Sequence, residues 1–425
     1  MKKVGVAILG LGVVGGGTYK ILTEHREFYK NNHGVDITVE GVLEKNRERA
    51  LSLGVDGGKI ASNVAEICSN SDIDIVVEAM GGIEPAKSFV LAVLNSGKSV
   101  VTSNKELYCK YGYELEKVAK KNGCGLYYEA TCVGGVPVIR ALLDNLQGNK
   151  ILSLTGIING TTNYILSKMS DCGASYGEVL KEAQKLGYAE ADPTSDVEGY
   201  DAVYKLSILS SICFHTKVPY AEVYREGITG IDIVDIRYGK QLGYVLKLLA
   251  IGKNGDNGIE VRVHPTLIKA SHPLASVNDS YNAVYISGDS VENVMLYGRG
   301  AGALPTGSAI VGDIIYCATH SGNNYSTFKN TEKADPAVKF IKNFESEYYL
   351  RLSAKDKAGV LTKITSHFSK HGISISQVIQ EQAANGQVPL IIMTHKTPES
   401  EVNKTVAELN ALGVADVASI IRVIS

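Results

Sequence analysis

The chain has 425 residues, a length that suits two or three domains rather than one. Hydrophobic residues make up 44% and charged residues 21% of the sequence, and the formal net charge is −2, so nothing in the composition points to nucleic acid or a membrane surface as a partner. Seven cysteines without a CxxC pair predict reduced thiols in the cytoplasm rather than a disulfide framework. No uninterrupted apolar stretch approaches the roughly 20 residues of a membrane-spanning helix.

Residues 1–130 alternate short β-branched runs with longer helical patterns over 84–96 and 105–121. The runs that predict strands are KVGVAILG, ITVEGVLE, DIDIVVEAM, KSVVTS and GLYYEAT. This alternation is typical of repeated βαβ units, in which a parallel sheet carries helices on both faces. We therefore predict the α/β class, with a Rossmann-type parallel sheet in the N-terminal domain.

A glycine-rich turn joins the first predicted strand to the helix that follows it, in the segment VAILGLGVVGGGTYKIL. Gly10 permits the tight turn, Gly12 lets a pyrophosphate approach the backbone, and Gly15 lets the helix pack closely on the strand. The first amides of the helix then point at the bound phosphates. Rather than a merely flexible turn, we predict a dinucleotide site formed by Gly10, Gly12, Val13, Val14 and Gly15.

The end of the second predicted strand decides which dinucleotide would bind. Glu44 is placed to bind the ribose hydroxyls of NAD. Lys45 lies beside it, and Arg47 and Arg49 follow, where cations would suit the 2′-phosphate of NADP. These basic residues could equally be the solvated start of a helix. The sequence leaves NAD and NADP open as cofactors.

Residues 131–320 predict a second domain of the α+β class, with an open antiparallel sheet, for catalysis and dimerisation. Its helical patterns cover 136–147, 161–169, 175–186 and 197–214, and its strand-like runs are GYVLKLLAIGK, IEVRVHPTLI, NAVYISG and NVMLYG. Polar residues 321–344 predict a linker. Residues 345–425 follow the order βαββαβ, which is typical of a ferredoxin-like module.

The segment GYAEADPTSDVEGYDAVYKL, residues 187–206, holds five carboxylates and a single lysine. Asp201 and Lys205 are four residues apart on the predicted helix and share one face. An exposed pair of this kind stabilises a helix by only about 0.3 kcal/mol. The apolar neighbours of Lys205 favour an inward helix, on which the lysine would meet a cleft. Such a lysine can deliver a proton to a carbonyl oxygen, and the surplus carboxylates suit a cationic group such as an α-ammonium.

Several motifs occur together between residues 5 and 315, in a fixed order and spacing. They are GLGVVGGGT, VVEAMGGIEPA, VTSNKELY, YEATCVGGVPVI, GIINGTTNYIL, EAQKLGYAEADPTSDVEGYDAVYKLSIL and GRGAGALPTGSAIVGDI. With these motifs the chain resembles homoserine dehydrogenase. The C-terminal module resembles an ACT domain, with DKAGVL at its first strand-to-helix turn, as in the monofunctional form of that enzyme.

The resemblance implies an NAD(P)-dependent oxidoreductase that interconverts L-homoserine and L-aspartate 4-semialdehyde, in the pathway to threonine, methionine and isoleucine. Lys205 would donate the proton to the aldehyde oxygen, oriented by Asp201, and Lys105 would lie between substrate and nicotinamide. The residues that the resemblance places against the polar groups of the substrate, its ammonium included, are Glu190, Asp196, Asp201 and Gly187.

The resemblance also implies cofactor contacts at Thr102, Ser103, Lys105 and Gly302. Residues 102–104 end the fourth predicted strand, which we expect at the switch-point crevice where a parallel sheet binds its ligands. The segment GALPTGSAIVGDIIYCA would form a helix, about residues 305–320, that returns to cover the nucleotide domain.

A monovalent cation, usually sodium, is a further implication of the resemblance. Its ligands would be Glu129 and the main-chain oxygens of Cys132, Gly134 and Val136. Main-chain oxygens do not depend on the side chain, so the valine in EATCVGG, where glycine is commoner, does not remove the site. The alternative is a plain glycine-bearing hinge without a cation.

For the ACT module we expect feedback inhibition by L-threonine, with contacts in the loop SAKDKAGVL, residues 353–361. Pairing of two such modules would favour a homodimer or homotetramer. The alternative for the module is dimerisation without a ligand. For the whole chain, the alternatives are another small amino-acid dehydrogenase and a sensor that binds dinucleotide and amino acid without turnover. The presence of both Lys105 and Lys205 speaks against the sensor.

Overall fold

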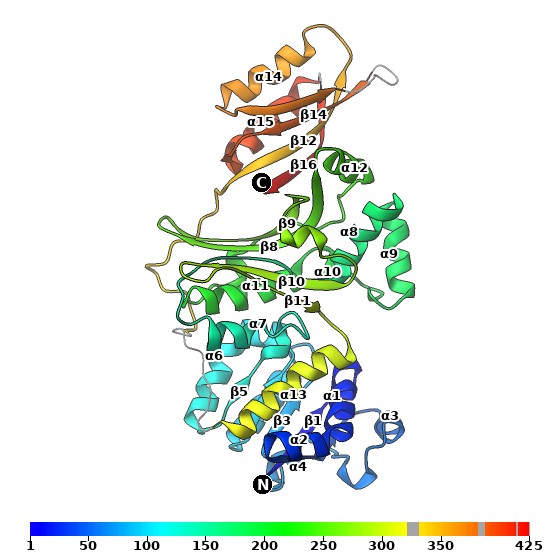
Figure 1. The fold of residues 1–425 in the computed structure, drawn as a ribbon, viewed down its shortest axis with the longest axis vertical. Coiled ribbons are helices and arrows are strands. Elements are labelled where there is room, and N and C mark those ends of the chain that lie inside the picture. Colours follow the sequence, from blue (N-terminus) through cyan, green and yellow to red (C-terminus); the bar gives the residue numbers. More distant parts are fainter. Residues whose placement is uncertain (321–330, 381–386, 414, 425) are drawn as a thin grey trace.

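The computed structural model describes residues 1–320, 331–380, 387–413 and 415–424 (Figure 1). Three regions follow one another along the long axis of the molecule, with the N-terminal domain at one end and the C-terminal module at the other. Within the described ranges, no helix combines the length and apolar character that a membrane crossing requires.

The N-terminal domain is built on a parallel sheet in the order β2-β1-β3-β4-β5. Strands β1 and β3 are buried almost throughout, as expected for a parallel sheet covered by helices. The predicted α/β class and Rossmann-type sheet are confirmed. The strands are β1 (Lys2–Leu9), β2 (Val35–Leu43), β3 (Ile75–Glu78), β4 (Ser99–Thr102) and β5 (Leu126–Tyr127), and the helices are α1 (Val13–Glu24), α2 (Arg26–His33), α3 (Arg47–Ser52), η1 (Gly57–Lys59), α4 (Val64–Ser69), α5 (Ala86–Asn95) and α6 (Lys105–Lys121).

The strand order of this sheet reverses between β1 and β3, because β2 lies on one side of β1 and every later strand on the other. The ligand crevice therefore opens at the ends of β1 and β3. Thr102 ends β4, one strand further along, so the expectation that residues 102–104 sit at the switch point itself is wrong. They lie beside it, and the Thr102 hydroxyl donates a hydrogen bond to Glu78 on β3 at 2.6 Å.

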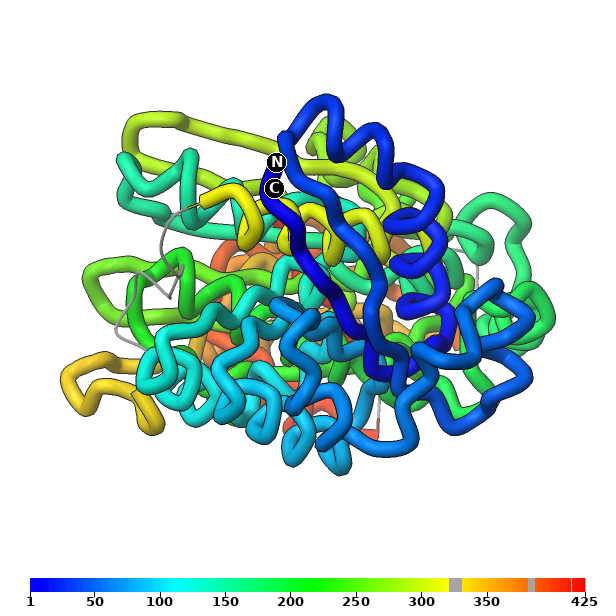
Figure 2. The backbone as a smooth tube through the Cα atoms, turned by 90° about the horizontal axis from the view of Figure 1, so that it is seen from below, coloured from blue at the N-terminus to red at the C-terminus, as the bar shows by residue number. Residues whose placement is uncertain are grey.

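Helix α13 (Ala303–Thr319) returns from the central domain to the N-terminal domain, as predicted. Figure 2 shows it beside the first helix and strand. Ile310 is fully buried in the same core as Ile8 of β1. Helices α1 and α13 approach most closely at Gly17, where a Cβ atom would lie 2.1 Å from the carbonyl oxygen of Ala303.

The central domain carries the antiparallel sheet β11-β10-β6-β8-β9, which confirms the predicted α+β arrangement. The helices α8 and α11 pack on this sheet. Its strands are β6 (Ile151–Ile157), β7 (Tyr224–Arg225), β8 (Tyr244–Gly255), β9 (Gly258–Lys269), β10 (Tyr281–Gly288) and β11 (Glu292–Arg299). The helices and turns are η2 (Glu129–Thr131), α7 (Val138–Arg140), η3 (Ala141–Asn145), α8 (Gly160–Cys172), α9 (Tyr176–Lys185), α10 (Thr194–Val197), α11 (Tyr200–Cys213), η4 (Tyr220–Glu222), α12 (Ile233–Gln241) and η5 (Pro273–Ser276).

The central domain differs from the sequence-based expectation in several elements, of which three matter most for the fold. The helix expected over 136–147 is a short α-helical turn followed by a π-helical turn, α7 and η3. Strand β6 and helix α12 were not predicted. The β6 sequence ILSLTGI mixes serine, threonine and glycine with apolar residues, which weakens its strand signal, and β6 is fixed by pairing with β8 and β10, neither of which is close in sequence.

The C-terminal module has the predicted βαββαβ order and the sheet order β16-β12-β14-β13. Leu350, Ile364 and Ile392 are fully buried between its sheet and helices. The elements are β12 (Glu345–Lys355), α14 (Val360–Lys370), β13 (Ile375–Gln380), β14 (Gln387–Thr394), β15 (Thr397–Pro398), α15 (Glu399–Leu412) and β16 (Ala415–Ile424).

The module does not hang free on its linker, because its sheet is continuous with the central sheet. Strand β16 pairs in parallel with the end of β9, with Arg422 opposite Thr266 and Ile424 opposite Ile268. The connecting segment also docks on β9, where the Ile259 amide donates to the Lys339 carbonyl at 2.8 Å. This pairing of distant strand edges leaves no mark in the local sequence of either strand.

The close approach of α1 and α13 predicts that Gly17→Ala destabilises the chain. The added Cβ would overlap the Ala303 carbonyl, and overpacking of this kind costs roughly 1–3 kcal/mol. Gly16→Ala is the matched control, because its Cβ would make only an ordinary 3.5 Å contact with Leu53. Thermal unfolding followed by circular dichroism should show a lower midpoint for Gly17→Ala alone. Equal midpoints for both variants would contradict the role of Gly17.

Candidate active site

Lys205 lies in the second turn of α11 and points at a buried carboxylate. Its Nζ atom contacts Asp201 Oδ2 at 2.7 Å and donates to the Ile158 carbonyl at 2.9 Å. The Lys205 side chain is 12% exposed and that of Asp201 4%. The helix therefore faces inward, and the Asp201–Lys205 pair predicted from the spacing is confirmed as a partly buried ion pair.

Lys105 reaches the same carboxylate from the other domain. It is the first residue of α6, and its Nζ atom lies 2.8 Å from Asp201 Oδ1. The Lys105 side chain is 40% exposed. One aspartate thus holds two lysines, one on each oxygen, at the boundary between the N-terminal and central domains.

Asn159 joins Asp196 to this cluster. Its Nδ2 atom donates to Asp196 Oδ1 at 2.7 Å and to Asp201 Oδ2 at 2.9 Å, while its Oδ1 caps α8 at the Thr162 amide. The sequence analysis did not single out Asn159. The only local signal is its N-cap position in the motif INGTTN, because its contacts to α10 and α11 depend on the tertiary fold.

The charges of the cluster fix its protonation. Burial alone would raise the pKa of Asp201, but the ammonium groups of Lys105 and Lys205 outweigh burial and hold that pKa well below its usual range. The Asp201 carboxylate in turn raises the pKa of Lys105, and Asp196 and Glu190 add to this effect. Burial, together with the Asp201 charge, raises the pKa of Asp196. At neutral pH, Asp201 is a carboxylate and Lys105 an ammonium.

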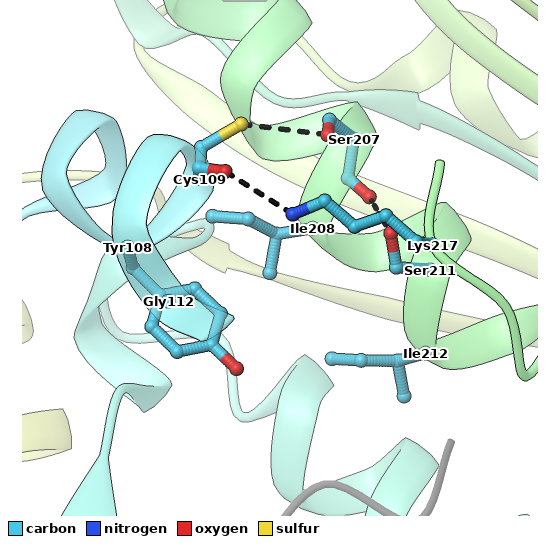
Figure 3. A pocket seen from close by; sticks show the side chains of 8 residues that line it. All are labelled: Tyr108, Cys109, Gly112, Ser207, Ile208, Ser211, Ile212 and Lys217. Atoms are coloured by element: carbon cyan, nitrogen blue, oxygen red, sulfur yellow. Dashed lines mark hydrogen bonds between the residues drawn. The ribbon is translucent and has the colours of Figure 1, made fainter. Parts of the chain in front are cut away.

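Helices α6 and α11, which carry the two lysines, are packed tightly against each other (Figure 3). The Cys109 thiol lies 3.4 Å from the Ser207 hydroxyl, and Lys217 donates to the Cys109 carbonyl at 3.3 Å. The cavity between the helices has a volume of ≈ 10 Å³, about enough for one water molecule. This packing fixes Lys105 relative to Lys205.

Gly187 and Glu190 lie on the exposed connection between α9 and α10. Gly187 has a φ of +78°, and the Glu190 carbonyl accepts a hydrogen bond from Gln184 at 3.1 Å. The Glu190 carboxylate contributes to the raised pKa of Lys105, after Asp201 and Asp196.

A groove with a volume of ≈ 840 Å³ lies at the carboxyl ends of β1 and β2, which is a typical size for a small-molecule site. Gly10 has a φ of +87°, and an added Cβ at Gly12 would meet no atom within 4 Å, so the backbone is open to the groove. Gly15 packs against Gly10, where a Cβ would lie 1.9 Å from its carbonyl oxygen. Val13 and Val14 form the first turn of α1, which has no side-chain cap. These features fit a dinucleotide pyrophosphate.

Glu44 joins β2 to the glycine turn. Its Oε2 accepts from the Leu11 amide at 2.6 Å and its Oε1 from the Asn46 amide at 3.0 Å. Lys45 and Arg49 line the same groove beside it. An acidic residue and several cations therefore meet at the expected ribose position, and the geometry is compatible with either nucleotide.

The groove and the lysine cluster are joined through Asn104, which caps α6 at the Leu107 amide and donates to the Gly82 carbonyl at 2.6 Å. Gly81, the preceding residue, lines the groove. Asn104, the residue before Lys105, thus ties the start of α6 to the segment after β3 that borders the groove. The predicted cofactor residues that do not line the groove are Val13, Val14, Gly15, Thr102, Ser103, Lys105 and Gly302.

Glu129 is the first residue of η2 and is buried. Its side chain reaches α7, where each carboxylate oxygen accepts one backbone hydrogen bond, from Ile139 at 2.9 Å and from Arg140 at 2.6 Å. Burial and the neighbouring Asp313 raise the pKa of Glu129 to about 8. Asp313, on α13, accepts from the Glu129 amide at 2.9 Å and was not singled out from the sequence. Among the described residues, no group of three His, Cys, Asp or Glu side chains could hold a metal ion.

The main chain after Glu129 leaves carbonyl groups without partners. Cys132 and Gly134 are buried, and within the described residues no hydrogen-bond donor reaches either carbonyl oxygen. Val133, between them, has a φ of +57°, a strained backbone for a β-branched residue. The Val136 carbonyl already accepts from the Val138 amide at 2.8 Å. Buried unpartnered carbonyls beside a carboxylate are the donor set that a hard monovalent cation prefers.

Family models cover most of the chain. Residues 10–129 match the NAD-binding domain of homoserine dehydrogenase, residues 137–315 match homoserine dehydrogenase, and residues 348–414 match the ACT domain. The chain is 38% identical over 431 residues to the homoserine dehydrogenase of Bacillus subtilis, which covers 100% of this chain and 99% of that protein.

Solved structures of homoserine dehydrogenases are also similar to this chain. A homoserine dehydrogenase from Thiobacillus denitrificans is 40% identical, covers 100% of this chain and 99% of its own, and superposes with a TM-score of 0.92. A hyperthermophilic archaeal homoserine dehydrogenase in complex with NADPH is 28% identical over 74% of this chain and 97% of its own, with a TM-score of 0.63. The likeness to the Thiobacillus denitrificans structure extends over the whole chain. The chain therefore belongs to the homoserine dehydrogenase family.

Proposed function

We propose that this NAD(P)-dependent homoserine dehydrogenase interconverts L-homoserine and L-aspartate 4-semialdehyde, with Lys205 exchanging the proton at the reacting oxygen. The observation that supports the proposal is the shared Asp201 carboxylate, which holds two ammonium groups, one on each oxygen, at the boundary between the N-terminal and central domains. When bound, the nicotinamide supplies or accepts the hydride.

Lys205 is suited to proton exchange by its hydrogen bonds. An ammonium has three donors, and Asp201 and Ile158 take one each. The third is left for the aldehyde oxygen, on which negative charge develops as carbon is reduced. Lys105, more exposed and held by the other oxygen of Asp201, adds positive charge between the substrate and the groove.

The carboxylates around the lysines suit the other end of the substrate. Asp196 is oriented by Asn159, and Glu190 approaches from the exposed α9–α10 connection beside Gly187. We assign Asp196 and Glu190 to binding the substrate ammonium. A cation binds most strongly where there are more carboxylates than ammonium groups, because some carboxylates are then left to pair with it. In this proposal the carboxylates of Asp196 and Glu190 bind the substrate, whereas Lys205 exchanges the proton.

Lys205→Ala should lower the turnover of homoserine oxidation by a factor of about 100 or more and leave cofactor affinity nearly unchanged. The reason is that the groove and Lys205 are built from different elements. Absorbance at 340 nm gives the turnover, and fluorescence titration with NADPH gives the affinity. Lys168→Ala is the matched control, because Lys168 pairs with Glu182 instead of Asp201. Equal losses of turnover and cofactor affinity would assign Lys205 a structural role.

We propose NADP(H) as the preferred cofactor. Lys45, Arg47 and Arg49 line the groove beside Glu44, and three cations against one carboxylate favour a 2′-phosphate over a ribose hydroxyl. The structure of the archaeal relative in complex with NADPH supports the same choice.

Arg49→Ala should raise the KM for NADP+ roughly tenfold, the loss of about one charge-assisted contact, and change the KM for NAD+ little. Initial rates with each nucleotide measure both constants in one preparation, so NAD+ is the internal control. An equal rise of the KM for NADP+ and the KM for NAD+ in this variant would refute the proposal that Arg49 binds the 2′-phosphate.

We propose a monovalent cation, with sodium as the first candidate, held by Glu129 and the carbonyl oxygens of Cys132, Gly134 and Val136. The unpartnered carbonyls of Cys132 and Gly134 and the buried carboxylate support it. Val136 is the weakest ligand of the four, because its carbonyl already accepts a hydrogen bond. The cation would neutralise Glu129 and tie the hinge between the first two domains.

Replacing sodium chloride by choline chloride at equal ionic strength should lower the thermal midpoint of the protein, because a ligand that binds only the folded state stabilises it. Choline is too large for the site and controls for ionic strength. Glu129→Gln should abolish the difference between the two salts. A midpoint that is the same in both salts for the unaltered chain would argue for a plain hinge.

The ACT module points to regulation, and we propose L-threonine as the feedback inhibitor, with the loop 353–361 as the contact expected from the sequence.

We also propose a homodimer or homotetramer, since β11 is an edge strand with exposed Met295 and Tyr297. Sedimentation velocity that gives a monomer mass would refute this. The sequence has seven cysteines and no CxxC pair, a pattern that supports a cytoplasmic location, and cell fractionation would test this.

A further inference from the structure

Asn159, the N-cap of α8, is buried beside α10 and α11, and its hydrogen bonds fix the orientation of its amide. Its Oδ1 atom accepts from the Thr162 amide at 2.8 Å and from the Thr162 hydroxyl at 2.9 Å. Its Nδ2 atom donates to Asp196 at 2.7 Å and to Asp201 at 2.9 Å. A flipped amide would turn its oxygen toward two carboxylates, so this orientation is the one that satisfies every partner. Both N–H donors of the amide are thus used on carboxylates.

The position of Asn159 is fixed by a second buried network, one turn further along α8. The Asn163 amide donates to the carbonyls of Val277 and Tyr281, each at 3.1 Å. Lys247 of β8 is 1% exposed, and its Nζ atom donates to Asn163 Oδ1 at 3.3 Å and to the Val277 carbonyl at 2.5 Å. The first turns of α8 are therefore anchored to β8 and to the segment that leads into β10. Helix α8 cannot move readily to make up for a lost contact at Asn159.

Asp196 lies among charged groups on three helices. Burial, and after it the charge of Asp201 on α11, raises the pKa of Asp196. The groups that lower this pKa are, in decreasing order, Asn159, Lys205 and Thr161. The Lys105 ammonium on α6 also faces Asp196, which adds to the raised pKa of that lysine. Because both lysines already pair with Asp201, Asn159 is the group that does most to keep Asp196 ionised.

We propose that Asn159 is a positioning residue that keeps Asp196 ionised beside the ionised Asp201 and thereby sets the acid limit of homoserine binding. The inference rests on the assignment of Asp196 to the substrate ammonium made above. A neutral Asp196 cannot pair with an ammonium, whereas Asp201 stays ionised through its two lysines. One amide thus lets two neighbouring carboxylates carry out separate tasks, since Asp196 binds the substrate and Asp201 holds the lysines.

Asn159→Ser tests this role, because serine is also a good N-cap for α8 but is too short to donate to both carboxylates while it caps. Without the amide donor, Asp196 holds its proton more tightly. The acid limb of the pH profile of kcat/KM for homoserine should therefore move to higher pH by about one unit. On that limb kcat/KM should fall about tenfold, through KM more than through kcat. The KM for NADP+ should not change, because the dinucleotide groove is built from other elements.

Three further variants complete the experiment. Asn159→Asp keeps the shape and the capping oxygen but replaces the donors by a third carboxylate, so it should move the acid limb further than Asn159→Ser does. Asn257→Ser makes the same change as Asn159→Ser in the exposed turn between β8 and β9, and it should match the unaltered enzyme. Asp196→Asn removes the titrating carboxylate and should raise the KM for homoserine across the whole pH range. Circular dichroism gives the thermal midpoint of each variant.

The outcomes separate this inference from the proposed function. An unshifted acid limb in Asn159→Ser, together with a raised KM for homoserine in Asp196→Asn, would overturn the role of Asn159 and leave the proposed function intact. A lower thermal midpoint in Asn159→Ser, with kcat and both KM values impaired alike, would assign Asn159 to structure alone. An unchanged KM for homoserine in Asp196→Asn would refute the ammonium assignment and this inference together, while the role of Lys205 stands on its own assay.

Discussion

The carboxylate of Asp201, shared between two ammonium groups, is the interaction on which the active site depends. A buried carboxylate is costly unless paired, and here each oxygen holds one lysine, at 2.8 Å and 2.7 Å. Lys105 belongs to the N-terminal domain and Lys205 to the central domain. The bridge therefore joins the N-terminal domain to the central domain through the two lysines that we propose act on the substrate. Removing Asp201 would leave two cations facing each other across the boundary.

The rest of the fold keeps that boundary rigid. Helix α13 leaves the central domain and packs on α1 beside the glycine turn, so the two domains share one core at the groove. Asp313 of that helix bonds to the Glu129 amide, which ties the proposed cation segment to the same junction. Farther away, β16 extends the central sheet into the ACT module. The module is thus tied to the central domain by the pairing of these strands.

Local sequence pattern predicted much of this. The alternation of strand and helix patterns predicted the parallel sheet. The spacing of Asp201 and Lys205, together with the apolar neighbours of Lys205, predicted the inward-facing ion pair. The role of Lys105 came only from the family resemblance, because a lysine at a helix start is unremarkable by itself. Asn159 was missed because its partners lie about 40 residues away, at 37 and 42 positions along the chain. Strand order at the switch point and the pairing of β16 with β9 were missed for the same reason, since neither is encoded in short segments.

The most direct test of the central claim is a crystal structure of the enzyme with NADP+ and L-homoserine bound. The account predicts that Lys205 Nζ lies about 2.6–3.2 Å from the substrate hydroxyl oxygen while still in contact with Asp201. A structure in which Lys205 points into solvent, or in which another side chain occupies that position, would contradict it.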